Sequence, residues 1–339
     1  MKFGLVGAGE IGTLRARALR RLDWAQLAAI AEIDLNRGRL AGSRSFEDWR
    51  EMLREVELDA VIVSTPPASH SEIVEAALEA GKDVLCEKPL APTPEVCRRL
   101  VESARRNGRT LAVGFNQRYF PAVYYVKRSI EAGEIGRPTH ARAYAGHRGL
   151  EELSREWEIE PEALRCGAIM DNGVHVIDHL RYLLGDFASV RGVALLAGPI
   201  DGAGPSSTSA LLASEDGRCA SLEASWTEWR GYRFHIDVFG DEGMARAYYG
   251  PMFALIVRGA ARRRRMKLFP ATTLREKLHG WQSTVTRTFE AELEDFRRMT
   301  AGEETNIAEG FDGYRAVEIA HAALESARSG KTVNLSEPF

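Results

Sequence analysis

A glycine-rich turn near the start of the chain has the residue types and spacing of a phosphate-binding loop. The sequence Gly7-Ala8-Gly9-Glu10-Ile11-Gly12 directly follows a predicted strand and opens a predicted helix. Gly7 permits the tight turn, Gly9 lets the backbone approach a pyrophosphate, and Gly12 allows close helix–strand packing. The N–H groups at the start of the helix then bind phosphate oxygens. We therefore predict a dinucleotide site that includes Gly7, Gly9, Glu10, Ile11 and Gly12.

An acidic residue selects between the two nicotinamide dinucleotides. Glu32 lies about 20 residues after the last glycine of the loop, at the end of the second predicted strand. A carboxylate there accepts hydrogen bonds from the ribose 2′-OH of NAD and repels the 2′-phosphate of NADP. Asp34 is a rival acid that is better placed to cap the next helix. We predict NAD, and Arg37 and Arg39 leave NADP as the less favoured alternative.

The elements that must position this loop alternate between strands and helices over residues 1–119. Predicted strands are Phe3–Val6, Gln26–Ala31, Asp59–Ser64, Asp83–Cys86 and Thr110–Gly114, and predicted helices are Ile11–Leu22, Ser69–Ala80 and Pro94–Asn107. This alternation is typical of a parallel sheet with helices on both faces. We predict an NAD-binding Rossmann domain, a doubly wound α/β fold, over residues 1–119.

The pattern changes to short β-type runs separated by turn residues over residues 120–339. Predicted strands are Thr139–Gly146, Ser189–Ala197, Ser207–Ser214, Cys219–Trp226, Phe234–Gly240 and Phe253–Arg258, and helical patterns cover 121–132, Ser283–Thr300 and Phe311–Ser329. Such runs are typical of an open, largely antiparallel sheet. We predict a C-terminal α/β domain for substrate binding and oligomerisation, with a C-terminal helix able to pack back on the first domain.

Composition excludes several classes of partner. Net charge is −3 with 45 basic and 48 acidic residues, which predicts neither nucleic-acid nor membrane binding. No apolar run approaches the roughly 18 residues of a membrane span. The cysteines form no Cys-x-x-Cys pair, so we expect reduced thiols in a cytoplasmic protein. The basic run Arg262–Arg265 is interpreted as a solvated loop, with an oligomer contact or an anion-binding patch as alternatives.

Four further segments carry a family resemblance. They are Val63–His70, Gly81–Leu90, Val113–Tyr119 and Gly167–Asp178, and they contain a Glu-Lys-Pro triplet and an Asp-x-Gly-x-His-x-x-Asp pattern. Together with the glycine loop they closely resemble the glucose–fructose oxidoreductase / inositol dehydrogenase / MocA (Gfo/Idh/MocA) family over nearly the whole chain. The run Arg165-Cys166-Gly167-Ala168 departs from the glycine-rich run that is frequent in the family.

The resemblance implies an NAD(P)-dependent dehydrogenase of sugars, inositols or related polyols that forms a homodimer or homotetramer. It implies that Lys88 is the active-site lysine and that Asp171 and His175 are the catalytic acid and imidazole. Further cofactor contacts are expected at Thr65, Pro66, His70, Glu87 and Lys88 itself. The resemblance also implies a cis peptide bond at Lys88–Pro89, which is permitted because an X–Pro bond loses only about 0.5–1 kcal/mol in the cis form.

The catalytic segment can also be considered from its periodicity. If residues 171–184 form one helix, Asp171, His175, Asp178 and Tyr182 share a face and the apolar residues spread around the opposite one. The alternative is an ordinary solvated face. His175 and His179 are spaced as a metal-binding pair, but no third ligand is evident, so no metal is predicted.

Candidate substrate contacts lie at the domain junction and on the catalytic helix. They are Asn116, Arg118, Tyr119 and Asp178, and for the first three a structural role is the alternative. A group of aromatic residues is interpreted as sheet packing in preference to a sugar-binding platform: Trp226, Trp229, Tyr232 and Phe234.

The predicted reaction is hydride transfer between a nicotinamide cofactor and a secondary alcohol or ketone. In this interpretation His175 transfers the hydroxyl proton, because imidazole titrates near neutrality, and Lys88 stabilises the developing alkoxide charge. Asp171 orients the imidazole or binds another substrate hydroxyl. Exchanged roles for Lys88 and His175 are the competing hypothesis. An NAD-dependent glycosidase and a non-catalytic nucleotide-binding sensor are the alternative functions.

Overall fold

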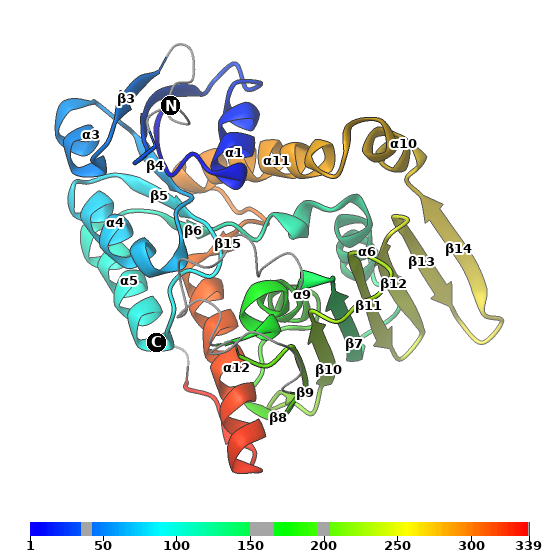
Figure 1. Cartoon of the computed structure of the whole chain (residues 1–339). Helices are drawn as coiled ribbons and strands as arrows, with labels where there is room; N and C mark the ends of the chain where they lie inside the picture. The colour runs from blue at the N-terminus through cyan, green and yellow to red at the C-terminus, as the bar shows by residue number, and fades with distance from the viewer. Residues whose placement is uncertain (35–42, 150–165, 196–203, 338) are drawn as a thin grey trace. The chain divides into compact units, whose positions relative to one another are not determined.

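A computed structural model describes residues 1–34, 43–149, 166–195, 204–337 and 339. The chain divides into two units, each built on one sheet (Figure 1). Unit 1 comprises Met1–Tyr119 and Arg275–Arg315, and unit 2 comprises Phe120–Leu274 and Ala316–Phe339. Within the described ranges, no helix combines the length and apolar character needed to cross a membrane.

The sheet of unit 1 has seven strands in the order β15-β6-β5-β4-β1-β2-β3. They are β1 (Lys2–Val6), β2 (Gln26–Ala31), β3 (Arg44–Phe46), β4 (Ala60–Val63), β5 (Asp83–Cys86), β6 (Leu111–Val113) and β15 (Ala308–Glu309). All neighbouring pairs are parallel except β15 with β6. The order 3-2-1-4-5-6 is that of doubly wound dinucleotide-binding folds, so the predicted Rossmann sheet is confirmed.

Helices cover both faces of this sheet. They are α1 (Glu10–Leu19), α3 (Trp49–Glu55), α4 (Pro67–Glu79), α5 (Pro94–Asn107), the 3-10 helix η1 (Asn116–Tyr119) and α11 (Gln282–Thr300). Phe3 and Leu5 of β1 pack with α1 and α11 in one buried cluster. The side chain of Met52 on α3 lies beside Gly4, so α3 covers the other face. The predicted helix Ser69–Ala80 begins two residues earlier, because α4 starts at Pro67 and the Ser69 hydroxyl donates to the Pro66 carbonyl within its first turn.

A buried cation joins three elements of unit 1. Arg15 of α1 is fully buried, and its guanidinium pairs with Glu87 after β5 at 2.7 Å and with Glu292 of α11. The guanidinium also lies 3.7 Å from the ring centroid of Phe289. Two carboxylates face one guanidinium, and an uncompensated buried charge is costly. The cluster therefore ties the α11 segment to the Glu-Lys-Pro loop although the two are far apart in the sequence.

The sheet of unit 2 has nine strands in the order β14-β13-β12-β11-β7-β10-β9-β8-β16. They are β7 (Pro138–Gly146), β8 (Ser189–Leu195), β9 (Ser207–Ala213), β10 (Cys219–Ser225), β11 (Arg233–Gly240), β12 (Gly243–Tyr249), β13 (Phe253–Arg258), β14 (Arg263–Leu268) and β16 (Val333–Asn334). Every neighbouring pair is antiparallel except β7 with β10. The prediction of a largely antiparallel second sheet is confirmed.

One face of the second sheet carries helices and the other carries half-buried side chains. The described α-helices that lie wholly in unit 2 are α6 (Pro121–Glu131) and α9 (Val174–Leu184). Two more helices, α10 (Pro270–His279) and α12 (Gly310–Ser329), each have residues in both units. On β7, Ala141, Ala143 and Ala145 are buried, and α9 packs against this strand. Tyr144 and Arg142 point to the opposite face.

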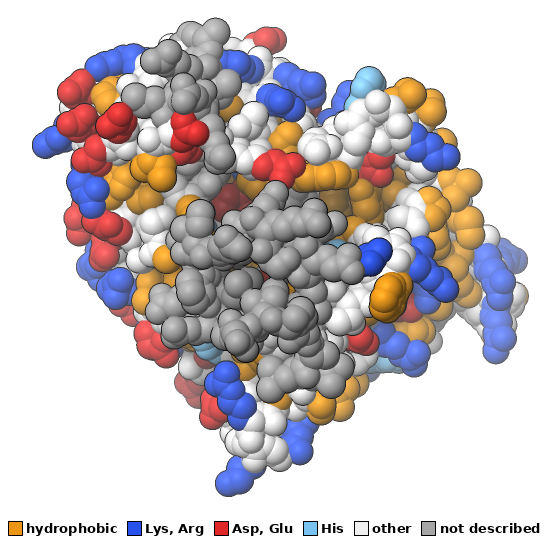
Figure 2. All heavy atoms as spheres, viewed as in Figure 1, with side chains coloured by type: hydrophobic (Ala, Val, Ile, Leu, Met, Phe, Trp, Pro, Cys, Tyr) orange, Lys and Arg blue, Asp and Glu red, His pale blue; other side chains and the backbone are white. Residues whose placement is uncertain are grey.

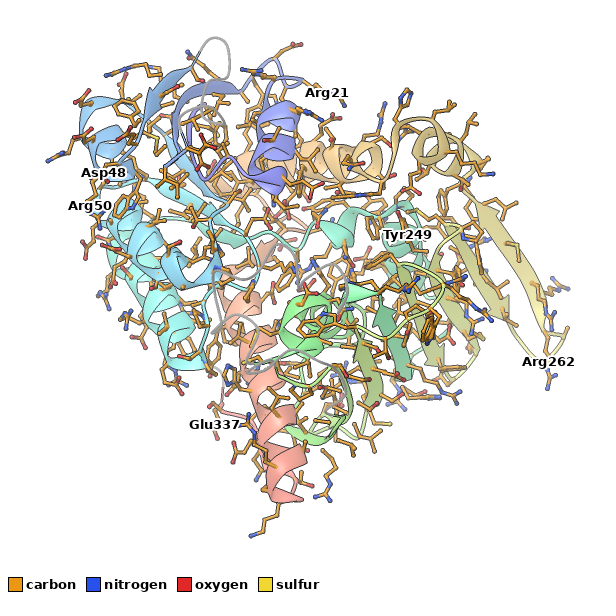
Figure 3. All side chains as sticks on the ribbon, viewed as in Figure 1. Arg21, Asp48, Arg50, Tyr249, Arg262 and Glu337 are labelled. Atoms are coloured by element: carbon orange, nitrogen blue, oxygen red, sulfur yellow. The ribbon has the colours of Figure 1, made fainter. Side chains whose placement is uncertain are left out.

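The basic run is a strand, so its interpretation as a solvated loop is wrong. Arg263–Leu268 forms β14, which pairs with β13 and is exposed along its length. The turn before it contains Arg262, which has a positive φ of 49° and is labelled at the tip of the hairpin in Figure 3. Lys and Arg side chains gather over β14 in Figure 2. The run of charges did not predict a strand, because its side chains show no alternation of polar and apolar residues. The strand forms through its backbone hydrogen bonds to β13.

The buried cation cluster generates a pH-dependence prediction. Burial raises the pKa of the Glu292 carboxyl to about 7, and the nearby Glu87 carboxylate adds to this while Arg15 opposes it. The folded state therefore binds this proton more tightly than the unfolded state. Its contribution to stability is present below the ordinary pKa near 4.5 and is lost as pH rises through about 7.

In Glu292→Gln this pH-dependent contribution to the free energy of unfolding should be absent, because the amide cannot ionise. We expect the free energy of unfolding in urea to fall less steeply between pH 4.5 and 7 than in the wild type. Glu290→Gln is the control, because it makes the same substitution two positions away on α11 at a partly exposed ion pair with Arg21. A wild-type slope in Glu292→Gln would contradict the assignment.

Candidate functional site

The glycine loop leaves space where a phosphate must approach. Gly7 has a φ of +89°, and a Cβ there would lie 2.6 Å from the Ser64 carbonyl oxygen. A Cβ on Gly12 would lie 2.0 Å from the Gly7 carbonyl oxygen, whereas one on Gly9 would meet nothing within 4 Å. Gly9 is the N-cap of α1, which begins at Glu10. The loop is therefore closed by two glycines and open at the third, as pyrophosphate binding requires.

The predicted ribose-binding acid is oriented toward this loop. Glu32 Oε2 accepts a hydrogen bond from the Ala8 backbone N–H at 2.6 Å, and Oε1 accepts from the Asp34 N–H at 3.1 Å. The carboxylate thus lies at the glycine loop, where the residues present fit the ribose and pyrophosphate of NAD. Arg37 and Arg39, on which the NADP alternative rested, lie outside the described residues.

His70 links two loops at the carboxyl ends of β4 and β5. Its ring is fully buried, with Nε2 at 2.8 Å from the Thr65 carbonyl oxygen and Nδ1 at 2.9 Å from that of Pro89. Burial lowers the pKa of this imidazole. The side chain therefore holds the Thr65–Pro66 turn against the loop that follows β5. This is a positioning contact, which differs from the direct cofactor contact that we expected of His70.

The Glu-Lys-Pro triplet directly follows β5. The Lys88–Pro89 peptide is cis, as predicted. Glu87 directs its carboxylate to Arg15, with Oε1 accepting from the guanidinium Nε at 2.8 Å. A Cβ on Gly114 would lie 2.7 Å from that guanidinium and 2.9 Å from Glu87 Oε2. Both neighbours of Lys88 are thus fixed by contacts within unit 1, Glu87 through Arg15 and Pro89 through His70.

The catalytic segment begins with a π-helical turn, so the expectation of one regular helix over residues 171–184 is corrected. The turn η2 spans Ile169–Gly173, and α9 follows over Val174–Leu184. The wider turn changes the angular relation between Asp171 and the α9 side chains that the 100° spacing predicted. A Cβ on Gly173 would lie 2.9 Å from Ala224 Cβ, which indicates how closely the turn packs on β10.

Asp171 is held by two donors from the second sheet. Its Oδ2 lies 2.9 Å from His147 Nε2 and accepts a hydrogen bond from Trp226 Nε1, also at 2.9 Å. The Asp171 and His147 side chains are each 23% exposed, whereas Trp226 is buried. A carboxylate bonded to an imidazole at a partly exposed position can orient that ring and support proton transfer.

The strand pairing explains why these donors meet. His147 and Trp226 directly follow β7 and β10, which are parallel neighbours and therefore end at the same edge of the sheet. Asn172, next to the acid, donates from Nδ2 to the Ala145 and Ser225 carbonyl oxygens at 3.2 and 3.3 Å. Sequence reasoning missed His147. Its position directly after a predicted strand was the available signal.

Two α9 side chains that we predicted to share a face with Asp171, those of His175 and Asp178, are buried, as is the neighbouring His179. His175 is 6% exposed, and Asp178 and His179 are 0% exposed, which excludes the solvated-face alternative. The His179 ring lies 4.9 Å from that of Phe234. Tyr182 contributes its carbonyl oxygen to Lys127 Nζ at 2.9 Å. In the part of the chain that the structure describes, no three His, Cys, Asp or Glu side chains are grouped as metal ligands.

The junction residues proposed as substrate contacts bond within unit 1. Asn116 donates to the Thr288 hydroxyl at 2.8 Å and Tyr119 to the Asp295 carboxylate at 2.9 Å, both on α11. Arg118 pairs with an aspartate of α12 at 3.1 Å. Burial raises the pKa of Tyr119 well above its usual range. These contacts favour the structural alternative, in which the three residues hold η1 against its neighbouring helices.

The open position in the glycine loop gives a matched pair of substitutions. Gly12→Ala should lower the free energy of unfolding by roughly 1–3 kcal/mol, because its methyl group meets the Gly7 carbonyl. Gly9→Ala should leave that free energy unchanged and weaken NADH binding about tenfold, because its methyl group occupies the open space. Urea unfolding and NADH fluorescence titration measure the two effects. Equal stability loss in both variants would contradict this account of the loop.

Family models match both units of the chain. Residues 1–115 match the model described as "Oxidoreductase family, NAD-binding Rossmann fold", and residues 123–246 match the Gfo/Idh/MocA C-terminal domain. An inositol 2-dehydrogenase from Acidothermus cellulolyticus is 30% identical, with 98% of this chain and 94% of that protein covered. The uncharacterized oxidoreductase YrbE from Bacillus subtilis is 28% identical, with 98% and 96% covered.

A solved structure is similar over the same length. Levoglucosan dehydrogenase in complex with NADH and levoglucosan superposes with a TM-score of 0.82 at 27% identity, covering 99% of this chain and 100% of that one. The similarity to these relatives therefore extends over nearly the full length of the chain. The chain belongs to the Gfo/Idh/MocA family of oxidoreductases, whose N-terminal domain is an NAD-binding Rossmann fold.

Proposed function

We propose that the protein transfers a hydride between NAD(H) and a secondary alcohol or ketone of a sugar, inositol or related polyol. The observation that carries this is the Asp171 carboxylate, which His147 and Trp226 hold at the edge of the second sheet. A partly exposed acid–imidazole pair can bind polyol hydroxyls and support proton transfer. Relatives named inositol 2-dehydrogenase and a similar dehydrogenase structure with a bound sugar support the substrate class.

Two other functions are less well supported on the same fold. An NAD-dependent glycosidase would release an aryl leaving group without net cofactor turnover, and a sensor would bind nucleotide without turnover. Comparable relatives are named as dehydrogenases, which favours net oxidation or reduction. The chain also retains Lys88, Asp171 and His175, which a binding protein would not need.

Different residues are assigned to charge stabilisation and to proton transfer. When bound, NAD accepts or supplies the hydride, and Gly9 and Glu32 hold its pyrophosphate and ribose. His175 moves the hydroxyl proton, since imidazole titrates near neutral pH. Lys88 stabilises the alkoxide charge that develops on the substrate. Asp171 is assigned to a substrate hydroxyl and to orienting His147, because its Oδ2 faces that ring.

Two substitutions test the assignment of the proton-transfer group. His175→Ala and Lys88→Met should both retain NAD affinity and both lose on the order of 10²-fold or more in turnover of a polyol substrate. The basic limb of the pH–rate profile near neutrality should disappear only in His175→Ala. Turnover is followed by nicotinamide absorbance across pH. Lys82→Met is the control, because it removes another lysine, directly before β5 instead of after it.

The pH profiles distinguish the competing mechanisms. Loss of the basic limb in Lys88→Met, with its survival in His175→Ala, would reverse the two roles. Full turnover in both variants would place the reaction elsewhere. If a library of sugars and polyols gives no cofactor turnover but aryl glycosides are cleaved, the glycosidase alternative replaces the dehydrogenase.

We also propose that the protein forms a homo-oligomer through the open face of the second sheet. A ladder of half-buried rings crosses β7, β11, β12 and β13, with centroid separations of 5.6, 6.3 and 4.9 Å between Tyr144, His235, Tyr248 and Phe253 in that order. Leu211 on the same face is 61% exposed.

The described cysteines are free thiols, which supports a reducing, cytoplasmic location.

Leu211→Asp should dissociate this oligomer, because it places a charge in the apolar face. Light scattering at micromolar concentration should give a dimer or tetramer for the wild type and a smaller mass for the variant. The control is Ser209→Asn, which changes a side chain on the same strand and face without introducing a charge. A monomeric wild-type protein would contradict the proposal.

A further inference from the structure

One tryptophan of the second sheet does not pack with the others. Trp226 and Phe234 are 2% and 1% exposed, which confirms their interpretation as packing residues. Trp229, on the loop between β10 and β11, is 81% exposed, so the same interpretation is wrong for this residue. An indole left in water forgoes the free energy that burial of a large apolar ring provides. The loop therefore presents Trp229 to solvent at a cost in stability.

Hydrogen bonds fix the loop that presents Trp229. The Glu228 carboxylate accepts from the Tyr144 hydroxyl at 3.0 Å and from the Arg230 N–H at 2.9 Å. The Glu228 N–H donates to the His147 carbonyl at 3.3 Å. These bonds attach Glu228 to β7 and to the segment that follows it, and they attach Arg230 to Glu228 across Trp229. The indole is therefore carried by an anchored turn.

The indole itself is supported on one side. The Arg148 guanidinium carbon lies 5.3 Å from the centroid of the Trp229 ring, within the range of cation–π attraction. Arg148 comes from the loop after β7, and Trp229 comes from the loop after β10. A cation over one face of the ring restrains its orientation and leaves the other face to contribute to the 81% exposure.

Both residues are close in the sequence to the two side chains that hold Asp171. Trp229 is three residues after Trp226, whose indole N–H binds Asp171, so its Cα lies within about 10 Å of that of Trp226. Arg148 directly follows His147, the other donor to Asp171. The segments after the two parallel strands thus supply one pair that binds the acid, His147 and Trp226, and a second pair that follows it in the chain, Arg148 and Trp229. The second pair lies beyond the strand ends, whereas the proposed oligomer face is formed by residues within the strands.

We propose that Trp229 is a stacking platform for a second ring carried by the substrate. The ligand class is a ring polyol bearing a further pyranose, as in a disaccharide or a glycosylated inositol. Pyranose rings have a flat C–H face that suits an aromatic surface, and aromatic side chains with few rotatable bonds provide contact area at low entropic cost. This inference rests on the proposed function, since the first ring occupies the Asp171 site.

The test compares matched substrates in wild-type protein and three variants. The pairs are glucose with cellobiose, galactose with lactose, and myo-inositol with galactinol, assayed with NAD. For at least one pair, wild-type kcat/KM should be about tenfold or more higher for the two-ring member. Trp229→Ala should remove that advantage and change the one-ring rate by less than about twofold, and Trp229→Phe should retain most of it. Arg230→Ala, an exposed neighbour whose backbone hydrogen bond is unaffected, is the matched control.

The outcomes separate this inference from the proposed function. Oxidation of one-ring polyols without preference for the two-ring members would overturn the platform and retain the dehydrogenase. An equal loss on both members in Trp229→Ala would also overturn it, as would a change of mass by light scattering in that variant, which would assign Trp229 to a subunit contact. If no polyol is oxidised, the proposed function fails. In that case the platform is tested by tryptophan fluorescence. Quenching by the two-ring probes in the wild type but not in Trp229→Ala supports the platform, and no quenching in the wild type overturns the platform.

Discussion

The arrangement of unit 1 depends on one buried cation. Arg15 lies between Glu87 and Glu292, and its ion pair with Glu292 joins residues 277 positions apart in the chain. Removing the guanidinium would leave buried carboxylates without compensation, which typically costs several kcal/mol. Because Glu87 immediately precedes Lys88, the contact that attaches α11 to the Rossmann sheet also fixes one side of the candidate active-site lysine. Fold and site therefore share this interaction in unit 1.

A second constraint acts within unit 2, where the single parallel pair of an otherwise antiparallel sheet forms the candidate site. Parallel pairing makes β7 and β10 end together, and the residues after them converge on the Asp171 carboxylate. Asn172 fastens the same strand ends from within the π-helical turn. The acid is thus positioned by the sheet itself, and rigid elements hold functional groups more accurately than loops do.

The α9 segment shows why a helical wheel was insufficient. The pattern placed polar residues on one face and apolar residues on the other, which is typical of a helix at the surface. In the structure both faces are covered, and His175, Asp178 and His179 are almost completely buried. Burying an ionisable group costs free energy unless the group is hydrogen-bonded or ion-paired. The burial of three such groups in this segment is therefore stronger evidence for a functional site than their spacing is. Exposure also distinguishes Trp226 from Trp229. The two residues are three positions apart in the sequence, but the first is buried and the second is exposed.

The sequence by itself determined the features that depend on local backbone chemistry. The strand–helix alternation, the glycine loop and the position of Glu32 follow from residue type and short-range spacing, and the cis Lys88–Pro89 bond was expected from the family resemblance of the same local segment. Tertiary structure decided what depends on contacts between distant segments. The α11 ion pair, strand β14 and the His147–Asp171 pair each require partners that are remote in the chain, and no local pattern specifies them. Hydrophobic periodicity identifies which residues are buried, but only the packed sheet determines which polar groups meet at its edge.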